Sequence, residues 1–205
     1  MFDARLRPML DPPLNALALA LASRGVGANA LTFTGLLVGL CAAGAISQGW
    51  FGWGLGLILA NRVLDGLDGA VARVNGPTDL GGYYDIVADF VFYVSVPLAF
   101  GLVTPGNLLP ALLLVASFVL SGTSFLAFAA VAARRGAARR GAETRAHGRK
   151  GFFYSTGLAE GGETILAFVA MCVFPGAFGW IACGFALLCV ATLLQRTAMA
   201  VRMFR

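Results

Sequence analysis

Long apolar segments, separated by short polar or glycine- and proline-containing connections, make up most of this chain. The longest include LTFTGLLVGLCAAGAIS and FGWIACGFALLCVATLL, close to the ~20 residues that a membrane-spanning helix needs. This pattern predicts an all-α integral membrane protein with six transmembrane helices. The expected spans are residues 29–47, 50–74, 79–102, 107–133, 154–174 and 177–200.

The composition argues against a soluble domain. Hydrophobic residues make up 59% of the 205 positions and charged residues only 12%, whereas soluble proteins carry roughly 25% charged residues. The 27 glycines fit this class, because glycine is more frequent in transmembrane helices than in soluble ones. We therefore expect a membrane-embedded chain without a soluble module and without a nucleic-acid partner.

The placement of positive charge supports an even number of spans. All 15 Lys and Arg residues lie before the first span, beside an aspartate-rich segment, between the fourth and fifth spans, or at the end of the chain. The connections around Gly49, Pro105 and Pro175 contain no charge. Six spans place every basic residue on one side, which the positive-inside rule assigns to the cytoplasm. We expect a multi-pass protein of the cell membrane with both termini and the aspartates facing the cytoplasm.

The N-terminal residues 1–27 differ from the rest of the chain. Their apolar run, Leu14–Ala22, is too short to span a bilayer. Early arginines before this run loosely resemble a signal peptide, but Asp3 and Asp11 dilute the positive charge. We expect a retained cytoplasmic segment whose helix lies in the membrane interface, followed by a six-span domain at residues 28–205.

Five aspartates fall within the segment DGLDGAVARVNGPTDLGGYYDIVAD, which joins the second and third spans. Asp65 and Asp68 are three residues apart and Asp85 and Asp89 four, so each pair shares a helix face. The intervening NGPT predicts a helix stop and a new N-cap. The midpoint in sequence between Asp65 and Asp89, the outer pair, falls on this turn. The midpoint between Asp68 and Asp85, the inner pair, falls there as well. A helical hairpin would therefore hold the four carboxylates at two matched levels.

The cost of burying these charges indicates what the cluster does. A charged side chain within a membrane span costs at least ~2.5–3.5 kcal/mol, and Arg73 alone cannot compensate four carboxylates. A divalent cation can, and oxygen ligands of this kind suit Mg²⁺, Mn²⁺ or Ca²⁺. The alternatives are buried helix–helix ties or a cation-binding transporter or channel. A transport path requires charge toward both membrane faces, and the opposite face of this chain has none.

The spacing of this segment resembles a known family signature. The segment reads Asp65-x2-Asp68-Gly69-x2-Ala72-Arg73 and then Gly81-x3-Asp85-x3-Asp89. It resembles the pattern D-x2-D-G-x2-A-R-x8-G-x3-D-x3-D of the CDP-alcohol phosphotransferase family. The spacer after the arginine has seven residues, one fewer than in the family pattern. This deletion lies in the inferred turn, where length changes are best tolerated.

The resemblance implies an enzyme of phospholipid biosynthesis. It would move a phosphatidyl, or other substituted phosphate, group from a CDP-activated donor to an alcohol and release CMP. CDP-diacylglycerol is the commonest donor that the resemblance implies. The acceptor, a small or phosphorylated alcohol, is left open. Family members often form homodimers, which glycine-rich spans permit.

The resemblance also assigns roles to single residues. The metal ligands would be Asp65, Asp68, Asp85 and Asp89, holding Mg²⁺ or Mn²⁺, with two ions expected. Asp89 would also act as the base that takes the proton of the attacking alcohol. The residues accommodating the CDP moiety would be Gly69, Ala72 and Arg73.

Weaker features have two interpretations each. A looser resemblance in ANALTFTGL places Asn29 and Thr32 near the nucleotide; alternatively Asn29 is a helix N-cap and Thr32 an ordinary residue of the first turn. Arg149 and Lys150 either set the topology or bind an anionic acceptor. Three acidic residues at expected helix starts fit the helix dipole, although two of them, near the fifth span, could instead orient acceptor hydroxyls. These residues are Asp79, Glu160 and Glu163.

Overall fold

The structure, a computed structural model, describes residues 3–142 and 159–204, and the side chains of residues 12–135 and 159–204. Every regular element in these ranges is helical, which confirms the predicted all-α class. Arg149 and Lys150 lie outside the described residues, whereas the first part of their basic connection, residues 134–142, continues helix α5. The helices are α1 (Asp3–Ser23), α2 (Ala28–Ser47), α3 (Phe51–Asn75), α4 (Asp79–Val103), α5 (Leu108–Ala142), α6 (Gly161–Val173) and α7 (Phe178–Phe204), with 3₁₀ turns η1 (Pro105–Asn107) and η2 (Pro175–Ala177).

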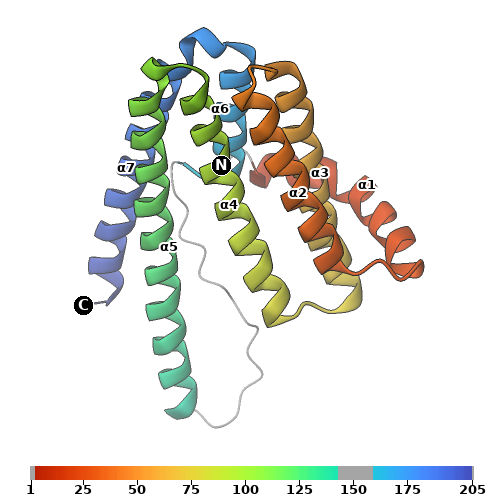
Figure 1. The fold of residues 1–205 in the computed structure, drawn as a ribbon. Helices are drawn as coiled ribbons and strands as arrows, with labels where there is room; N and C mark the ends of the chain where they lie inside the picture. Colours follow the sequence, from red (N-terminus) through yellow and green to blue (C-terminus); the bar gives the residue numbers. More distant parts are fainter. Residues whose placement is uncertain (1–2, 143–158, 205) are drawn as a thin grey trace.

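Helices α2–α7 run side by side and alternate in direction (Figure 1). The α2–α3, α4–α5 and α6–α7 connections lie at one end of the bundle, and the α3–α4 turn lies at the other. This is the arrangement that the charge pattern predicts, because the three uncharged connections share one end.

The helices α2–α7 follow the six predicted spans in order, but six spans are not established. In the described part of the chain, four helical segments are long and apolar enough to cross a membrane: residues 28–47, 79–103, 105–135 and 175–204. Helix α3 contains four charged residues, three of them in the aspartate-rich segment, and α6 has only 13 residues. The six-span count therefore stays a prediction.

The outer surface of the bundle is apolar, as a lipid environment requires. Its most exposed large hydrophobic residues include all three tryptophans of the chain. Trp50 and Trp53, at the start of α3, are 63% and 74% exposed, and Trp180, at the start of α7, is 86% exposed. All three therefore lie toward the end of the bundle with the uncharged connections. Tryptophan at one level of a helical bundle is typical of a membrane–water interface.

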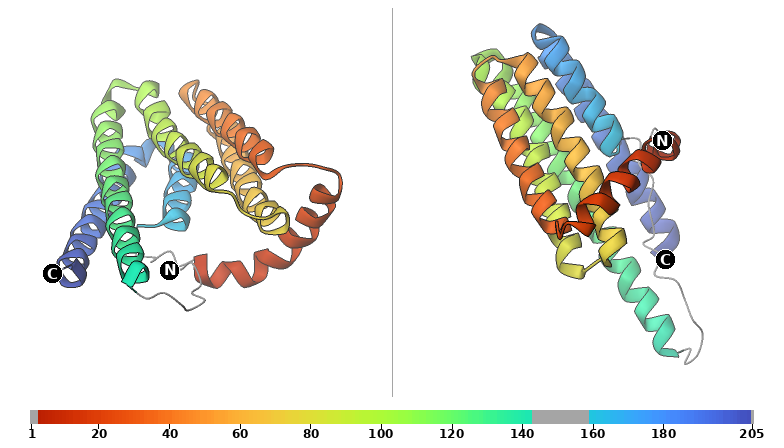
Figure 2. Two further views of the ribbon diagram at one scale, coloured as in Figure 1. Left: turned by 90° about the horizontal axis from the view of Figure 1, so that it is seen from below. Right: turned by 90° about the vertical axis from the view of Figure 1, so that its right-hand side faces the viewer.

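Helix α1 packs on the outside of α3 and crosses the bundle obliquely (Figure 2). Its Ala18 is fully buried against Leu67, Ala70 and Val71 of α3. The apolar face of α1 is thus tied to the helix that carries the first two aspartates. An orientation of this helix in the membrane interface stays a prediction.

Aromatic side chains from several helices fill the centre of the bundle. Phe92 of α4 contacts Phe168 of α6 edge to face, with centroids 5.7 Å apart. Phe100, further along α4, stacks on Phe178 of α7 at 4.8 Å. These four rings are almost completely buried, so α4 is anchored along its length. Such packing restricts how α4 can move relative to its neighbours.

The hairpin between α3 and α4 forms as the sequence predicts. Helix α3 ends at Asn75, and Gly76 adopts φ +92°, a conformation that favours glycine. Thr78 is the N-cap of α4, and its Oγ1 accepts a hydrogen bond from the Gly81 N–H at 3.0 Å. The turn therefore brings the two aspartate pairs onto adjacent antiparallel helices.

Glycine at the α2–α3 contact provides a test of this packing. A Cβ atom on Gly54 would lie 2.5 Å from Cγ1 of Ile46, whereas one on Gly56 of the same helix would meet nothing within 4 Å. We predict that Gly54→Ala destabilises the bundle by about 1–3 kcal/mol because the two helices must separate. Gly56→Ala should be neutral or slightly stabilising, since alanine favours helix. Thermal unfolding in detergent measures both, and a Gly54→Ala protein as stable as Gly56→Ala would contradict this packing.

Candidate active site

Three of the predicted aspartates come together between α3 and α4. Asp65, Asp68 and Asp85 each offer a carboxylate oxygen, and these oxygens all lie within 4.8 Å of one another. The helical spacing of three residues aligns the first two on one face of α3, and the turn brings Asp85 opposite them. Asp68 is only 5% exposed, whereas Asp85 is open to the surroundings. The cluster therefore has a buried base and an accessible side.

Thr32 of α2 holds the most buried of these carboxylates. Its hydroxyl donates a hydrogen bond to Oδ2 of Asp68 at 2.7 Å, and Thr32 itself is 8% exposed. A threonine one helical turn into α2 thus reaches a residue of α3. The same hydroxyl lies 3.2 Å from the Ala28 carbonyl oxygen, an ordinary contact within the helix. The shorter contact with Asp68 gives Thr32 a positioning role at the cluster, and its place at the nucleotide stays a prediction.

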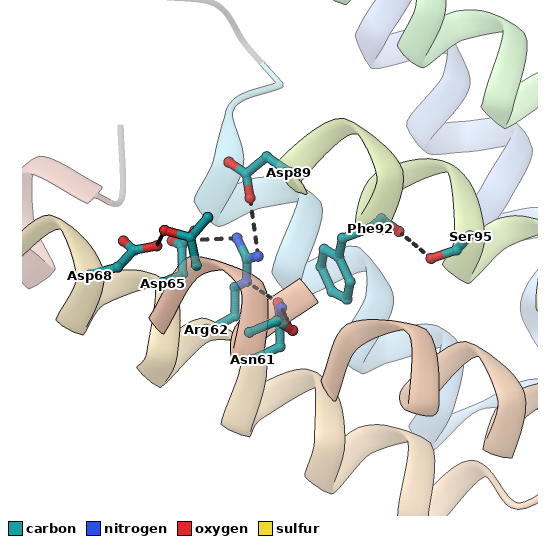
Figure 3. A network of polar contacts seen from close by, with 9 residues as sticks. Asn61, Arg62, Asp65, Asp68, Asp89, Phe92 and Ser95 are labelled. Carbon is teal, nitrogen blue, oxygen red and sulfur yellow. Dashed lines mark hydrogen bonds and ion pairs between the residues drawn. The ribbon is translucent and has the colours of Figure 1, made fainter. Parts of the chain in front are cut away.

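A partly buried arginine, Arg62, lies beside the cluster (Figure 3). Nη2 of Arg62 donates to Oδ1 of Asp89 at 3.1 Å, and Nη1 is 3.6 Å from Oδ2 of Asp65. The Arg62 side chain is 17% exposed, and those of Asp65 and Asp89 are 36% and 29% exposed. Arg62 thus bridges the outer aspartate pair that the sequence places at one level.

Further contacts fix the orientation of this arginine. Nε of Arg62 donates to Oδ1 of Asn61 at 2.8 Å, and Nδ2 of Asn61 donates to the Gly35 carbonyl at 2.8 Å. The guanidinium carbon lies 4.6 Å from the centre of the Phe92 ring, within cation–π range. The charge is therefore held by a hydrogen bond on one side and an aromatic face on another.

These groups line one pocket at the junction of three helices. The pocket has α2 on one side, the first aspartate pair of α3 at its base and α4 on the other side. Its lining residues are Thr32, Gly35, Leu36, Asn61, Arg62, Asp65, Asp68, Ala88 and Asp89. The pocket therefore combines hard oxygen ligands with one fixed cation.

The chemistry of the three gathered carboxylates fits a divalent metal. Carboxylate oxygens are the ligands that Mg²⁺ and Mn²⁺ prefer, and an open side leaves positions for substrate phosphate oxygens. The fourth predicted ligand, Asp89, does not join this group in the described part of the chain; it faces Arg62 instead. Asp79 also lies apart, exposed in the first turn of α4.

The residues expected at the nucleotide lie near the cytoplasmic side predicted for the cluster. A Cβ atom on Gly69 would lie 3.6 Å from Nη1 of Arg73, so the arginine passes over the glycine one turn earlier in α3. Ala72, which directly precedes Arg73, is half-buried. The glycine, alanine and arginine of the signature therefore lie on the last two turns of α3, next to the aspartates.

The side chain of Asn29, in the first turn of α2, lies close to the start of α4, and the interpretation of Asn29 as an N-cap is wrong. A Cβ atom on Gly81 would lie 3.2 Å from Oδ1 of Asn29. Helix α2 begins at Ala28 and its N-cap is Gly27, two residues before Asn29. Asn29 therefore lies inside the first turn, where its side chain approaches the signature glycine of α4.

The sequence did not reveal the structural roles of two arginines, the partly buried Arg62 and the buried Arg196. Arg62 was visible as a cation three residues before Asp65, a helical spacing that predicts an ion pair. Arg196 of α7 is 7% exposed and donates to the Ser121 carbonyl and the Ser124 hydroxyl, both at 2.8 Å. Neither the cross-helix partner Asp89 nor the serines of α5 could be inferred from local spacing.

Comparisons with known proteins agree with the signature. The family model described as CDP-alcohol phosphatidyltransferase matches residues 26–190. The inner membrane protein YnjF of Escherichia coli strain K12 is 42% identical over 197 residues, which cover 96% of this chain and 93% of that protein.

A solved structure shares the fold. It is the crystal structure of a Mycobacterium tuberculosis phosphatidylinositol phosphate synthase with CDP-DAG bound, which matches with a TM-score of 0.65 at 18% identity. The match covers 90% of each chain. The family model and the extended sequence identity together show that this chain belongs to the CDP-alcohol phosphatidyltransferase family.

Proposed function

We propose that this protein transfers a phosphatidyl group from CDP-diacylglycerol to an alcohol and releases CMP, in phospholipid biosynthesis. The observation that carries the proposal is that carboxylate oxygens of Asp65, Asp68 and Asp85, three aspartates that match the family signature, lie within 4.8 Å of one another. The solved relative of the same fold has CDP-DAG bound, which supports this choice of donor. The comparisons give no support to a cation transporter or channel.

The roles of the residues follow from their positions. Asp65, Asp68 and Asp85 would hold Mg²⁺ or Mn²⁺, and Thr32 would keep the Asp68 carboxylate directed at the ion. When bound, a divalent ion would neutralise the pyrophosphate and the charge that develops on the leaving CMP. Arg73, exposed on the last turn of α3, would meet phosphate of the donor.

Asp89 would act as the base. The alcohol oxygen would bond to the phosphorus of the phosphatidyl group, the bond from phosphorus to the CMP oxygen would break, and the alcohol proton would pass to Asp89. Oδ1 of Asp89 accepts a hydrogen bond from Nη2 of Arg62, which fixes the orientation of the carboxylate. Its other oxygen is then available to take the proton.

The active site would face the cytoplasm. The turn between α3 and α4, the end of α5 and the end of α7 lie at the same end of the bundle (Figure 1). Exposed basic residues of that end favour the cytoplasmic side by the positive-inside rule. They are Arg24, Arg73, Arg134, Arg135 and Arg202. Residues 1–27 would lie along the membrane interface and residues 28–205 would form the six-span domain.

A CMP-release assay tests the reaction. Purified protein should release CMP from CDP-diacylglycerol with one alcohol of a panel containing glycerol phosphate, serine, inositol phosphate and choline. Release should need Mg²⁺ or Mn²⁺ and should stop with a chelator. Asp89→Asn should lower the rate by about 100-fold or more, because general-base catalysis typically contributes 10²–10⁴-fold.

Asp79→Asn is the matched control for this variant. It makes the same substitution on the same helix, but Asp79 is exposed and outside the carboxylate group. Its activity should stay close to that of the unmodified protein. Equal activity of the Asp89→Asn and unmodified proteins would remove Asp89 from the mechanism, and metal-independent release would overturn the proposed metal site.

The adjacent glycines of α4 provide a second test. A Cβ atom on Gly81 would lie 3.0 Å from Oγ1 of Thr78 and 3.2 Å from Oδ1 of Asn29, whereas one on Gly82 would meet nothing within 4 Å. Gly81→Ala should therefore push Asn29 from its position and raise the KM for the CDP donor. Gly82→Ala should leave the KM unchanged. Identical KM values for the two variants would show that Asn29 and Gly81 do not form part of the nucleotide site.

A further inference from the structure

Arg62 divides the four signature aspartates into two groups. Asp65, Asp68 and Asp85 form the set whose oxygens approach one another within 4.8 Å. Asp89 instead pairs with Arg62 at 3.1 Å. Asp65 belongs to the first group, and its Oδ2 is also 3.6 Å from Nη1 of Arg62. The fourth carboxylate therefore already has a positive partner supplied by the chain.

This partner is built into the bundle rather than attached to its surface. Its guanidinium group donates a hydrogen bond to Asn61, which is 3% exposed. Asn61 in turn donates a hydrogen bond to the Gly35 carbonyl of α2. The Phe92 ring, fully buried in the core, covers one face at 4.6 Å. Figure 3 shows the guanidinium held between Asp65, Asp89 and Asn61. These contacts keep the positive charge at one position.

We propose that Arg62 takes the place of a second divalent cation beside Asp89, so that the protein without donor binds one metal ion. This inference rests on the proposed metal site at Asp65, Asp68 and Asp85. It differs from the two ions expected from the resemblance. A second cation at Asp89 would have to displace the guanidinium or lie next to it, and like charges at that distance repel.

The charges of the cluster lead to the same result. The four carboxylates carry four negative charges, and Arg62 and one divalent ion supply three positive charges. One negative charge remains, and Asp85 is the exposed member of the metal group. Removal of the Arg62 charge leaves Asp89 partly buried without its cation, which is costly at this depth. A second metal ion would then be the most effective substitute.

Equilibrium binding of Mn²⁺ to purified, donor-free protein in detergent tests this inference. Free Mn²⁺ is measured by electron paramagnetic resonance, so no catalytic activity is needed. The unmodified protein should bind one ion per chain. Arg62→Met, which keeps the apolar stem but removes the charge, should bind two. Arg62→Lys retains a cation and should still bind one.

Two controls separate a local effect from a general one. Arg73→Met removes a cation from the exposed end of the same helix and should leave the count at one ion. The double variant Arg62→Met with Asp89→Asn should return to one ion, because the ligand of the second ion is gone. Helix content and a single elution peak in size-exclusion chromatography show that each variant is folded.

Asp89→Asn alone gives an independent result that does not need the Arg62 variant to fold. If Asp89 is committed to Arg62, this variant should bind one ion with unchanged affinity. A loss of the ion, or an affinity at least about tenfold weaker, would make Asp89 a ligand and overturn the inference. Two ions in the unmodified protein, or one ion in folded Arg62→Met, would also overturn it.

The failure of this inference can be distinguished from failure of the proposed function. Metal-dependent CMP release together with two bound ions in the unmodified protein would overturn only the proposal that Arg62 replaces the second ion. No Mn²⁺ binding by the unmodified protein would instead remove the metal site on which both proposals rest. One bound ion without CMP release from any alcohol would leave the role of Arg62 intact and reject the proposed reaction.

Discussion

The structure depends on how the negative charge of four clustered aspartates is compensated inside an apolar helical bundle. Burial of a carboxylate without a partner is expensive, and aspartates at adjacent levels also repel one another. The chain itself supplies a hydroxyl donor, Thr32, for Asp68 and a guanidinium, Arg62, for Asp65 and Asp89. Those groups leave a net negative pocket in which the gathered oxygens remain suited to a divalent cation.

The packing around the pocket supports this arrangement. Glycines bring α2 close to α3 and α4: a Cβ atom on Gly39 would lie 2.8 Å from the Phe92 ring and 3.1 Å from Nδ2 of Asn61. The residues that this glycine allows to approach are those that hold Arg62. The close helix contact, the buried aromatic ring and the position of the charge therefore depend on one another. A substitution that alters one of them is expected to disturb the other two.

The sequence predicts the parts of this site that depend on local rules. Helical spacing aligns Asp65 with Asp68, and the NGPT stretch predicts the turn that brings Asp85 near them. The ion pair of Arg62 with Asp89 depends on the contact between α3 and α4. Spacing along α3 can indicate only the partner on the same helix, Asp65. Helix α2 begins at Ala28 with Gly27 as its N-cap, so of the two interpretations of Asn29 the N-cap is wrong. Contacts between helices distant in sequence account for what was missed.

The most direct test is a crystal structure of the Mn²⁺-loaded protein with the ion located by its anomalous scattering. The account predicts a peak among the oxygens of Asp65, Asp68 and Asp85, with Asp89 still bonded to Arg62. Anomalous density away from these three carboxylates, or none at saturating Mn²⁺, would contradict the central claim that this cluster is a metal site.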